Sequence, residues 1–192
     1  MDDMQEWAIQ RFDGLGLMGT PNKHLKMAQL QSLLESESQE HCSIHATLNS
    51  LVLRAPNGFR LQPSAVDMTV DGGLIGDRWS TGKANPGDQV SMMNLDVAHL
   101  IANGQSVVLF GDNMFTRLDL SKAALPVGTV LEVGSARLKV SEKPHVPCGQ
   151  FKARFGDAAF RWAANDHRIR GVYLTVVESG SAALGDPITI LS

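Results

Sequence analysis

Cysteine is scarce in this chain of 192 residues, which contains only Cys42 and Cys148. Two cysteines so far apart make no disulfide framework, and neither belongs to a Cys-x-x-Cys pair or to a Cys/His pattern with the spacing of a zinc site. We therefore expect both to be reduced thiols. The chemistry of a lone thiol depends on its surroundings, because the thiolate rather than the thiol is the nucleophile and the metal ligand.

Long apolar runs are absent too. No segment approaches the roughly 20 apolar residues of a membrane-spanning helix, and Met1–Glu6 is acidic where a secretory signal would be basic. We expect a cytoplasmic protein with no membrane association. A formal net charge of −3 does not favour nucleic acid as a partner. The expected partners are small molecules or other proteins, and the oligomeric state stays open.

Charge is nevertheless unevenly distributed along the chain. Seven acidic residues oppose three basic ones within residues 1–42, whereas seven basic residues oppose three acidic ones within residues 139–170. A run of like charges is often only a solvated face. The basic run surrounds Cys148, however, so the alternative is an anion-binding cleft with the thiol at its wall.

The N-terminal part of the chain favours a helix. Four leucines recur at a loose helical spacing after Asn22, a possible N-cap, and predict an amphipathic helix within residues 22–40. They are Leu25, Leu30, Leu33 and Leu34. A Ser-, Glu- and Gln-rich tract at 36–43 follows. We therefore place a boundary there, between an N-terminal helical extension (1–42) and a single domain (43–192).

The second unit changes to short β-like runs separated by turn residues. The runs lie at 48–54, 66–70, 89–93, 129–133, 137–140, 172–177 and 188–191. Helical patterns interrupt them at 95–102, where Asn103-Gly104 would end the helix, and within 149–164. Many short strands with Gly, Pro, Asn and Asp between them predict a mainly β barrel or sandwich with a few helices.

Five short segments in a fixed order are more specific. They are Gly72–Arg78, Gln89–Ser91, Gly111–Asn113, Pro147-Cys148, and a final group of Gly171–Tyr173 with Gly180 and Gly185-Asp186. None is specific alone, but together they resemble the MOSC family, the domain shared by molybdenum-cofactor sulfurases, amidoxime-reducing proteins and small stand-alone bacterial members. The resemblance covers about residues 45–192. It implies a MOSC-type β-barrel of the stand-alone bacterial kind.

The chain departs from the family's pattern in two places. Asp112 stands where many members have glutamate, and His145 stands where an arginine is common. The cysteine is intact, so the resemblance still implies the family's central chemistry. The departures leave the subfamily and the substrate open.

The setting of Cys148 favours a functional thiol over a buried structural one. Pro144 and Pro147 stiffen the approach to it. A helix over 149–155 would place the thiol at a helix N-terminus, where unpaired N–H groups favour the thiolate. Cationic neighbours act in the same direction: Lys143, His145 and Lys152. Cys42 has no comparable setting, and we interpret it as structural or incidental.

A thiolate suits two tasks that the sequence does not separate. It can bind molybdenum as a soft ligand, or it can carry a terminal persulfide. With the resemblance, we expect Cys148 and His145 to be the catalytic residues and Cys148 to be the metal ligand.

The resemblance also implies a site for the molybdenum cofactor (molybdopterin), which we expect purification to remove. The residues expected to bind it are Arg78, Gly111, Asp112, Asn113, Lys143, Lys152 and Arg154. A simple turn explains Gly111–Asn113 as well. Asp77-Arg78 could be a local ion pair instead of a phosphate grip. A cluster of His167, Arg168 and Arg170 could bind the phosphate or an acidic partner, or could be a solvated loop.

Three functions remain open. The first is a cofactor-binding protein that reduces N-hydroxylated compounds with electrons from a separate reductase, because the chain has no flavin, nicotinamide or iron–sulfur motif. The second is a sulfur carrier loaded by a separate cysteine desulfurase. The third is a non-catalytic barrel, or a hydrolase using Cys148 and His145, for which no orienting partner is evident. Resemblance of fold does not choose among them.

Overall fold

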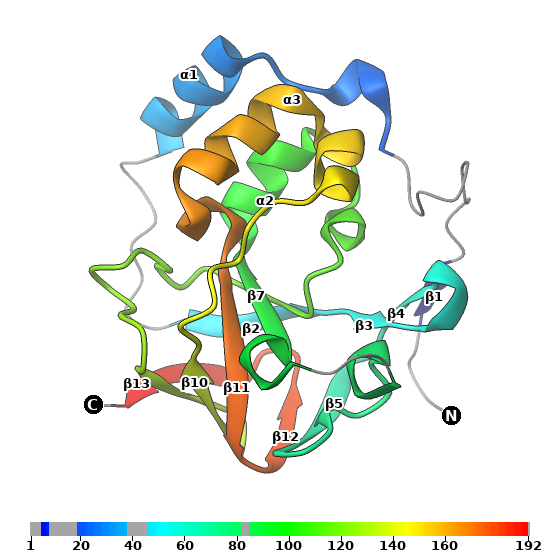
Figure 1. Cartoon of the computed structure of the whole chain (residues 1–192), viewed down its shortest axis with the longest axis vertical. Helices are drawn as coiled ribbons and strands as arrows, with labels where there is room; N and C mark the ends of the chain where they lie inside the picture. Colours follow the sequence, from blue (N-terminus) through cyan, green and yellow to red (C-terminus); the bar gives the residue numbers. More distant parts are fainter. Residues whose placement is uncertain (1–4, 8–18, 38–45, 82–84, 192) are drawn as a thin grey trace.

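The computed structural model describes residues 5–7, 19–37, 46–81 and 85–191 (Figure 1). Cys42 and the expected boundary at 42/43 lie outside these residues, so both expectations stay predictions. Among the residues described, no helix combines the length and the apolar character needed to cross a membrane.

A closed β-barrel forms the body of the molecule and confirms the expected fold class. Its strands follow one another around the barrel in the order β10, β11, β7, β8, β2, β13, β9. They are β2 (Ala46–Leu51), β7 (Val90–Asn94), β8 (Met114–Thr116), β9 (Val130–Val133), β10 (Ala136–Val140), β11 (Val172–Glu178) and β13 (Pro187–Leu191). Neighbours are antiparallel except β7 and β8, which are parallel.

Alternation of side chains explains the barrel interior. Along β10, Ala136, Leu138 and Val140 are buried, whereas Arg137 and Lys139 are exposed. Successive residues of a strand point to opposite faces, so this pattern sends every second side chain into the barrel. The register of β10 in the sheet is therefore set by its period-2 apolar pattern.

Two three-stranded sheets flank the barrel. One has the order β1-β4-β3, and the other has the order β12-β5-β6. Their strands are β1 (Gln5–Trp7), β3 (Leu53–Arg54), β4 (Arg60–Gln62), β5 (Ala65–Thr69), β6 (Gly73–Leu74) and β12 (Gly180–Ala183). Each of the seven expected runs overlaps a strand. The strands that had no sequence prediction are β1, β4, β6, β8 and β12.

A helical layer covers one end of the barrel (Figure 1). It consists of α1 (Met27–Glu37), α2 (Leu95–Ala102) and α3 (Gly149–Asn165). Short 3₁₀ turns complete the fold: η1 (Pro21–Lys23), η2 (Pro56–Gly58), η3 (Arg78–Thr81), η4 (Pro86–Asp88), η5 (Val107–Phe110) and η6 (His167–Arg170).

Strands β7 and β8 separate two apolar cores. Met92 and Met114 belong to the core inside the barrel, whereas Met93 and Phe115 belong to the core beneath the helices. Phe110 and Phe155 stack in this second core with ring centroids 4.0 Å apart. The helices are thus attached to the barrel by burial of aromatic surface, the largest favourable contribution that such residues offer.

The helix ends show which expectations held. Asn94 caps α2 by accepting from two backbone N–H groups, and Asn103 ends it in the left-handed region, as the Asn-Gly pair predicts. The N-terminal helix begins at Met27 rather than near Asn22, which lies in η1, so that prediction was wrong about the start. Leu30 is buried as expected, but Leu33 is 40% exposed.

Candidate functional site

Cys148 is the N-cap residue of α3, and its side chain is exposed. Solvent therefore reaches this thiol. Its expected place at the wall of an anion-binding cleft stays a prediction. Gly156 breaks α3 with a φ of 88° and a ψ of 172°, so the helix segment that follows Cys148 is short. Within the described part of the chain, no group of three or more His, Cys, Asp or Glu side chains could hold a metal ion.

Four arginines influence one another, and one of them, Arg154, also interacts with Cys148. Burial lowers the pKa of Arg60 to about 10, and the charges of Arg154 and Arg78 act in the same direction, as does that of Arg54. Burial also lowers the pKa of Arg154, and the next largest influence is a negative charge on Cys148, which would raise it. We call Arg54, Arg60, Arg78 and Arg154 the arginine cluster.

Negative charge does not balance this cluster. Asp77 pairs with Arg54 at 2.8 Å, but Arg60 and Arg78 make no ion pair within residues 19–37, 46–81 and 85–191. Arg60 is only 4% exposed, and its buried Nε has no hydrogen-bond partner in the same residues. A buried cation without a counter-ion is costly. Such a group indicates a place where an anionic ligand would be stabilised.

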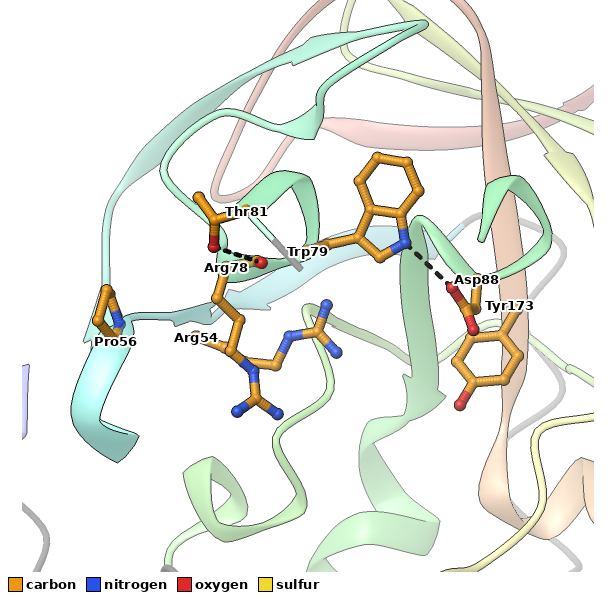
Figure 2. A pocket seen from close by; sticks show the side chains of 7 residues that line it. All are labelled: Arg54, Pro56, Arg78, Trp79, Thr81, Asp88 and Tyr173. Carbon is orange, nitrogen blue, oxygen red and sulfur yellow. Dashed lines mark hydrogen bonds between the residues drawn. The ribbon is translucent and has the colours of Figure 1, made fainter. Parts of the chain in front are cut away.

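A cavity of about 470 Å³ opens beside the cluster (Figure 2). Its walls are Arg54, Pro56, Arg78, Trp79, Thr81, Asp88 and Tyr173. Figure 2 shows the guanidinium groups of Arg54 and Arg78 between Pro56 and the phenol ring of Tyr173. Trp79 Nε1 donates to Asp88 Oδ1 at 3.0 Å, which fixes the indole ring. The cavity combines aromatic walls with cationic ends and is large enough for a small organic ligand.

The Gly111–Asn113 loop turns inward rather than toward this cavity. Asn113 is fully buried, and its amide accepts two hydrogen bonds from Ser91 and donates to Val52 and Asp77. Gly111 has a φ of 73°, and a Cβ there would lie 3.2 Å from Arg60 Nη2. The loop therefore packs against the arginine cluster and braces Asp77.

Asp112 lies between His145 and Arg170 but of these two binds only the arginine. Arg170 Nη1 forms an ion pair with Asp112 Oδ2, while His145 Nε2 lies 3.6 Å from Oδ1, which is longer than a hydrogen bond. Burial raises the pKa of Asp112, although the charge of Arg170 opposes this. Burial and the charges of Arg170 and Arg54 hold the pKa of His145 well below its usual range. His145 is therefore a neutral imidazole, stacked on Tyr173 with centroids 4.1 Å apart.

The remaining predicted residues have other partners. Lys143 forms an ion pair with Asp88, and Lys152 forms one with Asp157 at 2.7 Å. The two lysines are thus partly neutralised, unlike Arg78.

The basic residues of η6 also bind within the protein. Arg168 Nη1 donates to the carbonyls of Leu120 and Leu125 and so fixes the loop that contains them. Arg170 forms an ion pair with Asp112. The interpretation of Asp77-Arg78 as a local ion pair was wrong, because the partner of Asp77 is Arg54.

Several residues of the site had no sequence prediction. They are Arg54, Arg60, Trp79, Asp88 and Tyr173. Arg54 and Arg60 flank a Pro-Asn-Gly turn, and two arginines around a turn beside the Gly72–Arg78 motif were the available signal. The carboxylate that faces His145 was also missed, because Asp112 lies far from it in the sequence.

Comparison with known proteins identifies the domain. The sequence model of one protein family, the MOSC domain, matches residues 94–189 of this chain. YuaD from Bacillus subtilis has a similar structure with a TM-score of 0.55 and 20% sequence identity, covering 75% of this chain and 94% of that protein. YiiM from Escherichia coli matches with a TM-score of 0.53 and 19% identity, covering 76% and 70% of the two chains.

YiiM from Geobacillus stearothermophilus matches with a TM-score of 0.55 and 14% identity, covering 77% of this chain and 75% of that protein. At these identities the likeness concerns the fold alone. No curated protein matches the sequence.

Proposed function

The chain belongs to the MOSC domain family, and from this premise we propose that it binds the molybdenum cofactor with Cys148 as the protein ligand of the metal. The observation that carries the proposal is the excess of arginine charge beside an exposed thiol. A soft sulfur donor suits molybdenum, and guanidinium forks suit a phosphate.

The residues present fit the chemical groups of such a cofactor. Arg60, Arg78 and Arg154 would hold its phosphate, and the unpartnered Nε of Arg60 would gain an acceptor. Trp79 and Tyr173 would line the flat pterin in the cavity of about 470 Å³. When bound, the cofactor would supply two-electron redox chemistry, which no side chain of the cavity offers.

The reaction that we propose is the reduction of an N-hydroxylated compound. The N–O bond breaks, two electrons come from a separate reductase, two protons come from water, and the products are the compound with N–H in place of N–OH (an amidine in the case of an amidoxime) and water. His145 would accept or pass a proton as a neutral imidazole. Tyr173, whose pKa is raised to about 12 by burial, would stay protonated and donate a hydrogen bond to the departing oxygen.

One observation also favours the sulfur-carrier function. An exposed thiol with arginine charge nearby is accessible to a desulfurase and able to hold a persulfide. A cysteine desulfurase as donor would then replace the reductase as partner.

The deciding experiment compares wild type, Cys148→Ser and Cys42→Ser proteins made in a host that synthesises the cofactor. Molybdenum is measured by mass spectrometry, and pterin is measured by fluorescence after oxidation. Turnover is measured as the reduction of an amidoxime with a supplied reductase. We expect wild type and Cys42→Ser to contain metal and turn over, and Cys148→Ser to lose turnover while melting at a similar temperature. A wild type that holds no pterin but takes labelled sulfur onto Cys148 would establish the carrier function instead.

A further inference from the structure

The N-terminal segment contacts the backbone of α3 where that helix is broken. Gly156 leaves the helical conformation, and carbonyl groups in the turn before a helix end need partners from outside the helix. The carbonyl of Arg154 accepts from His24 Nε2 at 3.1 Å and from Gln105 Nε2 at 3.4 Å. Since a carbonyl only accepts, His24 carries its proton on Nε2.

Two glycines make this contact close. A Cβ on Gly19 would lie 1.9 Å from the carbonyl oxygen of Arg154, and a Cβ on Gly156 would lie 2.9 Å from the His24 side chain. Neither space could hold a side chain without movement of the backbone. The positive φ of Gly156 adds a second reason for glycine there, because other residues are strained in that conformation.

Further contacts hold the segment in place. Thr20 donates its N–H to Gln105 Oε1 at 2.6 Å, and Asn103 Nδ2 donates to the carbonyl of Lys23 at 3.0 Å. Leu30 of α1 is buried in the core beneath the helices. Figure 1 shows α1 lying over α3. The segment is therefore an ordered part of the fold at this point.

Arg154 connects this contact to the proposed cofactor site. Its guanidinium donates to the carbonyl of Leu109 at 2.8 Å and to Gln150 Oε1 at 3.1 Å. Gln150 lies two residues after Cys148, the N-cap of α3, so this hydrogen bond holds the guanidinium at the end of the helix that carries the thiol. A negative charge on Cys148 raises the pKa of Arg154, which agrees with this placement. The His24 hydrogen bond acts on the backbone of the same residue. A shift of that backbone would therefore move a positive charge relative to the thiol.

We propose that His24 is a positioning residue for Arg154, so that the segment 19–24 sets the affinity for anions beside Cys148. The segment lies outside residues 94–189, the part of the chain that matches the family model. The proposal gives the N-terminal extension a role in the site and deepens the proposed function, whose phosphate contact includes Arg154.

Thiol reagents test the proposal without the cofactor. In a Cys42→Ser background, Cys148 is the single cysteine, and its reaction rates with dianionic 5,5′-dithiobis(2-nitrobenzoate) and with neutral 4,4′-dithiodipyridine are compared. The ratio of the two rates measures the preference for an anion, and it should fall as salt is added. Arg154→Gln defines the ratio of a site without this guanidinium.

His24→Ala should lower the ratio about fivefold toward the Arg154→Gln value, the factor that a hydrogen bond of ordinary net strength represents. His24→Gln should restore the ratio, because its amide N–H can donate to the same carbonyl. Lys26→Ala is the matched control, since it removes an exposed cation two residues after His24 whose backbone N–H bonds Gln29. Gly19→Ala should displace the segment from the carbonyl of Arg154 and should therefore lower the ratio as His24→Ala does. It replaces His24→Ala in the experiment if that variant fails to fold.

An unchanged ratio in folded His24→Ala or Gly19→Ala, together with a lowered ratio in Arg154→Gln, would refute the positioning role. An unchanged ratio in Arg154→Gln would refute it too, because Arg154 would then contribute nothing at the thiol. If the wild type binds no molybdenum but His24→Ala lowers the ratio, the proposed function fails and the positioning role stands.

Discussion

Replacing Asn113 with alanine should strongly destabilise the protein, because its amide is the centre of a buried hydrogen-bond network. The amide oxygen accepts from the backbone N–H and the hydroxyl of Ser91, each at 3.1 Å. The amide nitrogen donates to the carbonyl of Val52 at 3.1 Å and to Asp77 Oδ2 at 2.9 Å. Asn113 is 0% exposed, so water does not reach these groups to replace the amide.

The size of the effect follows from these contacts. Four hydrogen bonds with a net value of about 1 kcal/mol each amount to about 4 kcal/mol. Alanine keeps the backbone hydrogen bonds of residue 113, so only the side-chain contribution is lost. The change should also loosen Asp77, and through it Arg54 at the wall of the cavity.

Urea unfolding followed by tryptophan fluorescence measures the loss. Asn49→Ala is the control, since Asn49 is exposed and its amide contacts only Thr47 within the described chain, and its free energy of unfolding should change by less than about 0.5 kcal/mol. If Asn113→Ala unfolds at the wild-type urea concentration yet loses affinity for molybdopterin, Asn113 is a cofactor contact and the network reasoning is wrong.

Two pH measurements test the electrostatics. Burial alone would raise the pKa of Asp77, but the hydrogen bonds and charge of Arg54 lower it. The ionised Asp77 therefore stabilises the fold above the unfolded pKa of about 3.9, and this stabilisation is lost as the pH falls through the folded pKa. Stability should therefore decline less steeply in acid for Asp77→Asn than for wild type, and equal slopes would contradict the ion pair. Tyr173, the single tyrosine, has its pKa raised to about 12 by burial, so near-ultraviolet absorbance should show tyrosinate only at that pH in the native protein and near pH 10 after unfolding. Native titration near pH 10 would mean that the phenol is not buried beside His145.

Elements with a strong local signal were predictable. The strand β10 alternates between buried and exposed residues, and α2 carries both its Asn94 cap and its Asn103-Gly104 end within the sequence. Strand β8 has no such signal, because its three residues are all buried and its partners β7 and β2 are remote in the chain. The break in α3 at Gly156 was also missed, since a single glycine in a helical pattern is compatible with a continuous helix.

The mainly β character of the chain and the ordered motifs that lead to the family could be predicted before the fold was known, and so could the choice of Cys148 as the candidate site residue. These depend on residue type and on spacing along the chain. Which charges meet depends on contacts between remote parts of the chain, which the sequence does not show. Arg78 is next to Asp77 in sequence, yet Arg54 pairs with Asp77 and leaves Arg78 at the cavity. Arg54 lies in β3 and Asp77 in the turn between β6 and η3, so the packing of two segments that are remote in the chain determines this ion pair and the charge that remains for a ligand.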